Sequence, residues 1–163
     1  MIRIALTDLG RYNNGELVFE WVDLPVDDFE EVMERLGNPE EYFISDYECD
    51  IPHMAIHEYE NLENLNNLAA ELECMSTYEK MILVAIMEAD GSPIDEALET
   101  LEAENYMFYA TENFEDFIDI FIEDGFFGEI PEEMREFLDY EKLAHYFQDR
   151  GFHLTSMGVI NTF

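Results

Sequence analysis

Carboxylates are the most abundant groups of this chain that could do chemistry, with 40 Asp and Glu residues against 7 Lys and Arg. Two carboxylates can serve as a general acid and base, but among so many acids such pairs arise by chance, so none identifies a catalytic site. Acids at alternate positions can bind calcium, yet an EF-hand loop with Gly91 or Gly125 at its sixth position would begin at Ile86 or Ile120. We therefore expect weak, nonspecific binding of divalent cations and no dedicated metal site.

Histidines are the other candidate metal ligands. His53 and His57 are four residues apart, so a helix would place them on one face. Zinc needs two further ligands, however, and His145 and His153 are far away in the sequence. The chain also lacks the GxxxxGK(S/T), GxGxxG, GxSxG and HExxH motifs. These patterns predict no cofactor and favour ordinary surface or interface histidines.

The acidity itself is the strongest signal. The formal net charge is −33, while hydrophobic residues make up 48% of the chain and aromatic residues 14%. Strong acidity often accompanies disorder, but this apolar content can build a core, so we expect a folded protein. Such a charge destabilises a compact chain, and solubility asks for a net charge of only about 2–8 in a small domain. Because the acids are spread along the chain rather than gathered in a tail, the charge is expected to have a function.

The same charge limits the partners and the compartment. An acidic surface is repelled by anionic lipid and by nucleic acid, so direct binding to either is not expected. The longest apolar run, 81–87, is too short to span a bilayer, and residues 1–10 do not resemble a signal peptide. Cys49 and Cys74 form no disulfide framework, which fits a reducing cytoplasm.

Apolar periodicity and turn residues predict the elements of the first third. Strands are expected at residues 2–8, 16–24 and 41–48, with a tight hairpin turn at Asn13-Asn14-Gly15. Between the last two strands, Asp27 or Asp28 can cap a short helix that Gly37 ends. One face of this helix is expected to carry Phe29, Val32, Met33 and Leu36.

The remaining two thirds predict mostly helices. The leucines from 62 to 72 recur at helical spacing, Ser76 with Glu79 forms a capping box for a helix to about 89, and Ser92-Pro93 opens a third helix to about 103. A strand at 105–110, a helix from about 113 to 124, short helices after Pro131 and Asp139, and a hairpin over 152–163 follow. We predict an α+β fold, an elongated chain of three small domains: an N-terminal α/β domain (1–57), a central helical domain (58–104) and a C-terminal α+β domain (105–163).

Acids share faces on several of these helices. Near residues 113–124, the apolar stripe leaves Glu115, Asp119 and Glu123 at successive spacings of four residues. Each like-charge pair at this spacing costs about 0.2–0.5 kcal/mol. One acidic face is usually only a solvated face, but several with few compensating bases predict a continuous negative surface. Its expected members are Asp27, Glu30, Glu31, Glu34, Asp95, Glu96, Glu99, Glu102, Glu115, Asp116, Asp119, Glu123, Asp124, Glu129, Glu132 and Glu133.

A rigid negative surface can take the place of DNA. Duplex DNA carries one charge per roughly 1.7 Å of its axis, so such a surface could occupy a cleft lined with Lys and Arg. Arg35 is the one base expected to relieve an acidic face, through Glu31. Composition alone leaves other interpretations open: a halophilic protein, a chaperone-like binder of basic proteins, an inhibitor of another DNA-binding protein, or a calcium-binding acidic protein.

Particular residues favour the interpretation that the negative surface takes the place of DNA. The run Leu9 to Leu17, followed by Trp21 and Pro25, resembles the opening of the ArdA-type antirestriction proteins (alleviation of restriction of DNA). Residues 42–48, with Asp46-Tyr47-Glu48, resemble the next segment of that family, as do 125–131 and Asp139-Tyr140 near the C-terminus. The sequence departs from the family at Glu20, where a small residue is expected before Trp21. The stretch from residue 117 corresponds to the antirestriction motif of the family.

The resemblance implies a curved, elongated homodimer without catalytic activity, whose acids imitate the phosphates of bent B-form DNA. The implied partner is the methyltransferase core of type I restriction-modification enzymes, blocked at its DNA groove in the bacterial cytoplasm. Such proteins are carried by plasmids and conjugative transposons. The segment expected to carry the motif and to lie at the dimer interface comprises Phe117, Phe121, Gly125, Phe126, Phe127, Gly128, Glu129, Ile130 and Pro131.

Overall fold

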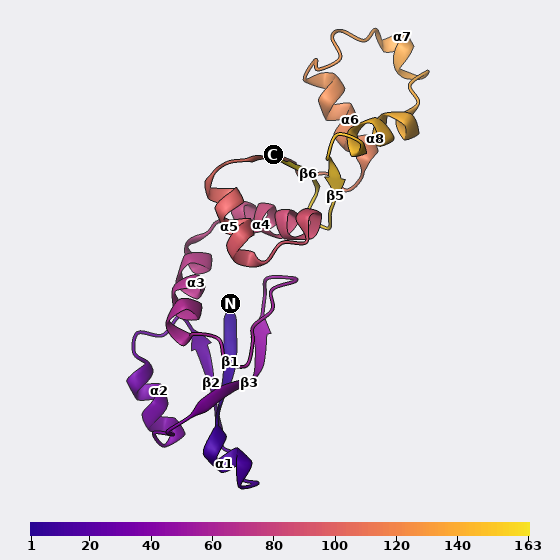
Figure 1. Cartoon of the computed structure of the whole chain (residues 1–163). Helices are drawn as coiled ribbons and strands as arrows, with labels where there is room; N and C mark the ends of the chain where they lie inside the picture. The colour runs from indigo at the N-terminus through magenta and orange to yellow at the C-terminus, as the bar shows by residue number, and fades with distance from the viewer. The chain divides into compact units, whose positions relative to one another are not determined.

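The computed structural model describes residues 1–163, which separate into two units, Met1–Ser76 and Thr77–Phe163 (Figure 1). Both units combine helices with a small antiparallel sheet, so the predicted α+β class is confirmed. The division into three domains and the elongated arrangement stay predictions. The boundary between the two units falls between two helices that the sequence assigns to one central domain.

A three-stranded sheet forms the centre of the first unit. Its strands are β1 (Ile2–Asp8), β2 (Phe19–Leu24) and β3 (Tyr42–Cys49), antiparallel in the order β2-β1-β3. The first unit also contains α1 (Leu9–Asn13), α2 (Phe29–Leu36) and α3 (Leu62–Cys74). The strands β1 and β3 and the two longer helices lie where apolar periodicity predicts them.

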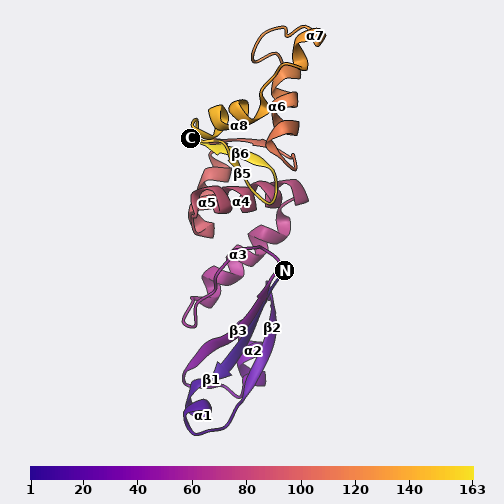
Figure 2. The same ribbon diagram turned by 90° about the vertical axis from the view of Figure 1, so that its right-hand side faces the viewer.

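One face of β1 and the apolar side of α2 build much of the core of this unit. Ile2, Ile4 and Leu6 are almost fully buried, as are Val32 and Leu36 of α2. Helix α2 packs along β1 and β2, as Figures 1 and 2 show from two sides. Because successive side chains of a strand point to opposite faces, the odd-numbered residues of β1 lie on the other face of the sheet.

The connection from β1 to β2 differs from the predicted tight hairpin turn. Asp8 accepts a hydrogen bond from the backbone N–H of Arg11 (2.9 Å) and so caps the short helix α1. Gly15, with a φ of +82°, turns the chain only after that helix. β2 therefore begins at Phe19 rather than at residue 16.

The second unit contains five helices and a second small sheet. Its elements are α4 (Thr77–Asp90), α5 (Ile94–Glu102), β4 (Tyr106–Tyr109), α6 (Phe114–Glu123), α7 (Glu132–Arg135), α8 (Tyr140–Gln148), β5 (His153–Leu154) and β6 (Val159–Thr162). The strands pair in the order β4-β6-β5. The predicted closing hairpin is confirmed, and at its turn Gly158 lies so close to the carbonyl of Tyr109 that no Cβ atom would fit.

Two groups of contacts hold this unit together. The interior of α4 is buried from Ile82 to Met87, and α4 packs on α5 and β6. The predicted apolar stripe of α6 is confirmed, since Phe117 and Ile118 are fully buried and pack with Phe147 of α8. One cap differs from prediction: Pro93, with extended backbone, is the N-cap of α5, and Ser92 makes no capping hydrogen bond.

Candidate functional site

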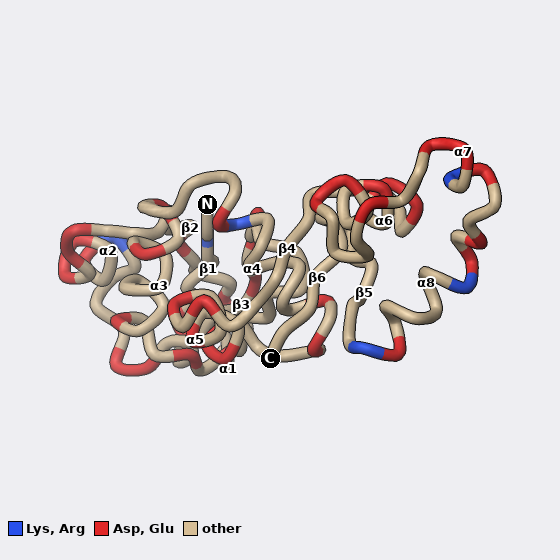
Figure 3. The backbone as a smooth tube through the Cα atoms, turned by 90° about the horizontal axis from the view of Figure 1, so that it is seen from above, with Lys and Arg blue, Asp and Glu red and all other residues tan.

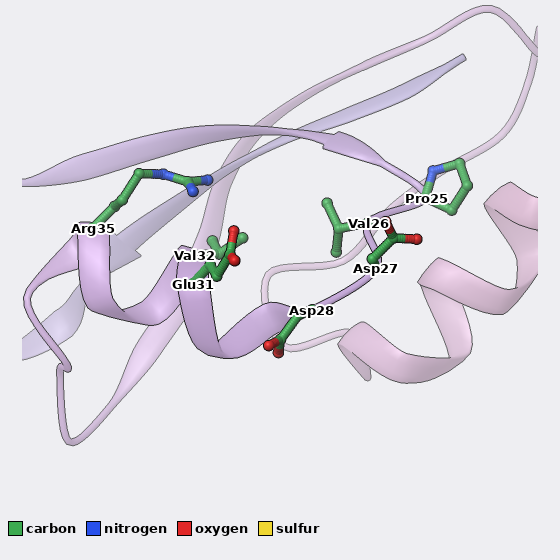
Figure 4. Close-up of a pocket in the computed structure, with 7 residues that line it drawn as sticks. All are labelled: Pro25, Val26, Asp27, Asp28, Glu31, Val32 and Arg35. Atoms are coloured by element: carbon green, nitrogen blue, oxygen red, sulfur yellow. The ribbon is translucent and has the colours of Figure 1, made fainter.

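The acids of α2 project from a helix whose other side is buried. Asp27, Glu30, Glu31 and Glu34 are exposed, and Asp28 caps the helix by accepting from the N–H of Glu30 (2.7 Å). A cavity of about 370 Å³ lies between this helix and the connection that joins it to β2. Figure 4 shows its lining: Pro25, Val26, Asp27, Asp28, Glu31, Val32 and Arg35.

Arg35 does not form an ion pair with the acidic face of α2. The sequence pairs Arg35 with Glu31, but the structure pairs it with Glu20 of β2, at 2.8 Å. That prediction was wrong because Glu20, on the strand that packs beside α2, lies within hydrogen-bonding distance of the Arg35 guanidinium. The ion pair also explains the acid at position 20, where the family resemblance led us to expect a small residue.

The acids of α5 form the most regular acidic face of the chain. Asp95, Glu96, Glu99 and Glu102 are all exposed, whereas Ile94, Ala97, Leu98 and Leu101 on the opposite side are buried. No base lies among them along the helix. The apolar side of α5 anchors the helix on the unit, so these four carboxylates are presented from a fixed backbone.

Helix α6 carries a second such face with one exception. Glu115, Asp116 and Glu123 are exposed, but Asp119 is partly buried and accepts a hydrogen bond from the hydroxyl of Tyr140 (2.5 Å). This hydrogen bond to a carboxylate raises the pKa of Tyr140. Asp119 thus has a packing role between α6 and α8 that the sequence did not indicate.

The remaining predicted acids lie at and after the end of α6. Asp124, Glu129, Glu132 and Glu133 are exposed. Figure 3 shows acidic residues along α2, α5, α6 and α7, with few basic residues among them. Of the sixteen acids named from the sequence, Asp119 alone is not exposed.

Most of the few bases are already engaged by acids of the same chain. Five of the seven form ion pairs within 3.6 Å: Arg3 with Asp23 and Glu48, Arg11 with Asp8, Arg35 with Glu20, Arg135 with Glu132, and Lys142 with Asp139. A sixth, Arg150, stacks on the ring of Tyr146 at 3.6 Å. Pairing leaves little free positive charge to offset the excess of carboxylates.

The stretch 117–131 has a buried part and an exposed part. Phe117 and Phe121 belong to the core of α6 and α8. The segment 125–131 leaves that core: Phe126 is 57% exposed and Phe127 40% exposed. Phe126 nevertheless stacks on Phe121, with ring centroids 4.0 Å apart. The segment therefore packs on the core of its own unit through Phe121 and at the same time presents two aromatic rings to solvent.

This segment also borders a cavity of about 440 Å³. Its lining combines apolar and charged side chains: Ile122, Glu123, Gly125, Gly128, Glu129, Ile130, Pro131 and Arg135. Gly125 and Gly128 both have a φ of +78°, a conformation that costs little only for glycine. The backbone of the segment thus depends on these two positions.

The histidines and cysteines do not converge on a site. No group of three or more His, Cys, Asp or Glu side chains is arranged to hold a metal ion. His53 and His57 lie in a segment without helix, so the shared helical face considered for them does not form. Burial raises the pKa of the Cys49 thiol, which makes it less reactive.

Comparison with known proteins identifies the family. The family model described as "Antirestriction protein (ArdA)" matches residues 4–161. The chain belongs to the ArdA antirestriction protein family. The match spans both units, including the helical stretch between the two ends where the resemblance had been seen. A search among curated proteins found no match. No helix of this ArdA-family chain has the length and apolar character needed to cross a membrane.

Proposed function

We propose that this ArdA-family protein inhibits type I restriction-modification enzymes by occupying their DNA-binding cleft in place of DNA. The observation that carries the proposal is the set of exposed carboxylates on packed helices. Five of the seven bases form ion pairs, and only the pair of Arg135 with Glu132 involves a member of that set. Membership of an antirestriction family supports the class of target. The proposal involves no catalytic step, because the inhibitor only has to bind.

Elementary electrostatics explains how such a surface competes with DNA. A cleft that binds DNA is lined with Lys and Arg, which lose their DNA counter-charge when the duplex leaves. Carboxylates on fixed helices can supply that charge, and long-range attraction speeds the encounter. The four acids of α5, whose helix is anchored by Ala97 and Leu98, are the simplest example of such an array.

The target proposed within the enzyme is the methyltransferase core, which must hold DNA for both modification and cleavage. The encounter would take place in the cytoplasm of a bacterial host, where such enzymes meet incoming DNA. The negative surface would face the Lys and Arg of the DNA groove.

We also propose that the segment 125–131 lies at the interface of a homodimer. Phe126 and Phe127 support this because two consecutive residues, set between Gly125 and Gly128, both present large aromatic rings to solvent. Two copies repel each other electrostatically, so an interface between them needs apolar contacts. The half-exposed rings, held by Phe121, are suited to make them.

A competition assay tests the main proposal. The purified protein is titrated into a type I methyltransferase at several concentrations of cognate DNA, and methyl transfer is measured. Competitive inhibition predicts that added DNA restores activity and that no ternary complex forms. Inhibition that persists unchanged at saturating DNA, with both ligands bound together, contradicts the proposal.

A further inference from the structure

One face of the first sheet carries several aromatic rings, next to the buried residues Ala5 and Thr7 of β1. On β1 the side chains of Arg3, Ala5 and Thr7 lie opposite the face on which α2 packs. The strand register places Trp21 beside Ala5, and places Phe19 and Phe43 on either side of Thr7. Figure 2 shows this sheet and the helix α2 together.

These rings form a row that is open to solvent. Phe19 is 46% exposed, and Trp21 and Phe43 are half-buried. Tyr12 of α1 extends the row by packing edge-on against Phe43, with ring centroids 5.3 Å apart, and is itself 53% exposed. We call Tyr12, Phe19, Trp21 and Phe43 the aromatic sheet face.

Arg3 shows what chemistry this face accepts. Its guanidinium lies 5.0 Å from the centroid of the Trp21 ring, a cation–π arrangement. The same group lies 3.2 Å from a carboxylate oxygen of Asp23 and 3.6 Å from one of Glu48. At one end of the face, an aromatic ring and two carboxylates therefore surround a guanidinium of the chain itself.

The other end of the face has the same components without a stacked cation. Phe19, Phe43 and Tyr12 have no base over their rings. The exposed acid Glu41 directly precedes β3 at this end, and the exposed acid Asp46 lies opposite Ala5, level with Trp21. Arg11 is the base of α1, and its charge is met by Asp8 at 3.6 Å.

We propose that the aromatic sheet face binds arginine side chains of the target protein. The proposal rests on the proposed function, because it deepens it from general charge pairing to recognition of guanidinium groups. Arginine fits better than lysine, since its planar, weakly hydrated head stacks on aromatic rings while its N–H groups reach carboxylates. A second copy of this chain is disfavoured as the occupant, because the acids bordering the face would repel each other.

The sole tryptophan of the chain reports directly on this face. Nona-arginine and nona-lysine peptides, which have equal charge, are titrated into the full-length protein while the fluorescence of Trp21 is followed. The expected result is tighter binding of the arginine peptide, accompanied by a change in Trp21 emission. Equal affinity for the two peptides, or binding that leaves Trp21 emission unchanged, overturns the inference.

Variants separate stacking from charge. The double variant Phe19→Leu, Phe43→Leu keeps apolar volume but removes two rings, so the preference for the arginine peptide should fall by about two- to fivefold per ring. The matched control, Glu96→Gln with Glu99→Gln on α5, should weaken both peptides alike and keep the preference. Circular dichroism and thermal melting verify that each variant is folded. An arginine preference that survives loss of both rings contradicts the inference.

A last measurement distinguishes failure of this inference from failure of the proposed function. The Phe19→Leu, Phe43→Leu variant and the parent are compared as inhibitors of a type I methyltransferase. Weaker inhibition by the variant is expected; equal inhibition refutes the role of the face while leaving competition with DNA intact. A parent protein that does not inhibit refutes the proposed function. In that case the preference for the arginine peptide still tests, independently, whether the aromatic sheet face binds guanidinium groups. Trp21 emission that changes on dilution of the protein alone would assign the face to self-association and also refute the inference.

Discussion

Helix α5 and the segment 125–131 belong to the same unit but expose opposite kinds of surface. α5 buries its apolar side chains and presents four carboxylates. The segment does the reverse, since Phe126 and Phe127 remain exposed beside a core that already contains Phe117 and Phe121. The difference indicates two kinds of binding: charge spread over many weak contacts, and apolar area concentrated in a few residues.

The largest effect is expected from the concentrated surface. Changing Phe126 and Phe127 together to Ala should weaken dimerisation by about a thousandfold, since two interface hot spots of about 2 kcal/mol each sum to about 4 kcal/mol. Sedimentation at a series of dilutions measures the change. A parent that is already monomeric at high concentration would refute the interface outright.

A core variant provides the control for that experiment. Phe117→Ala removes a fully buried ring and should destabilise the second unit by about 3–5 kcal/mol, at every protein concentration. The exposed pair should cost less stability, because those rings keep much of their surface in water already. If the Phe126 and Phe127 variant melts as early as Phe117→Ala, the segment is core rather than interface.

The distributed surface should respond gradually. Exposed ion pairs contribute about 0.2–1 kcal/mol each, so Glu99→Gln alone should weaken inhibition by no more than about fivefold. Neutralising all four acids of α5 should weaken it by about fourfold to a thousandfold, as four contributions of about 0.2–1 kcal/mol accumulate. Inhibition constants measured for each step test the gradation. A single exposed acid whose neutralisation abolishes inhibition, with folding intact, would instead indicate a discrete site.

Raising the salt concentration should have opposite effects on binding through the acidic surface and on dimerisation through the aromatic segment. Exposed charges are screened over about 8–10 Å at moderate ionic strength, so affinity for the methyltransferase should fall as salt rises. Dimerisation through apolar rings should not fall, and relief of repulsion between two chains of −33 should strengthen it. Affinity for the enzyme that is flat from low to high salt would indicate an apolar interface there too.

A small effect is expected at Asp119, the one partly buried acid of α6. Tyr140 donates to Asp119, and this hydrogen bond raises the tyrosine pKa above its ordinary value of 10.0. The stabilisation is fully present below pH 10.0 and is lost as the pH rises from there through the folded-state pKa, because the unfolded chain loses the proton first. Tyr140→Phe should remove about 1 kcal/mol and this alkaline dependence. Chemical denaturation at a series of alkaline pH values measures both, and an unchanged dependence in the variant would contradict the assignment.

Local patterns in the sequence were sufficient for most elements of the fold. Asp28 and Asp139 cap helices as expected, and Gly37 ends α2 in a left-handed conformation. The apolar stripe of α6 and the acids opposite it follow from a helical period of 3.6 residues. These features could be predicted because each depends on residues within a turn or two of the chain.

Contacts between segments that are distant in the sequence could not be predicted from it. The ion pair of Arg35 with Glu20, the use of Asp119 by Tyr140, and the row of rings that joins Tyr12 to Phe43 all link elements separated by many residues. The helix α1 was also missed, since an Asn-Asn-Gly turn signal outweighed the capping side chain of Asp8.

Composition and helical spacing by themselves determined that this chain folds, that it is strongly negative and that its helices have acidic faces. Charge and amphipathicity are properties of the residues and their period, so they can be read before any fold is known. Only the tertiary structure decided which of those acids are free, which bases they engage, and that Phe126 and Phe127 face solvent while Phe117 and Phe121 do not. Those outcomes depend on which elements pack together, and packing is decided by the whole chain at once.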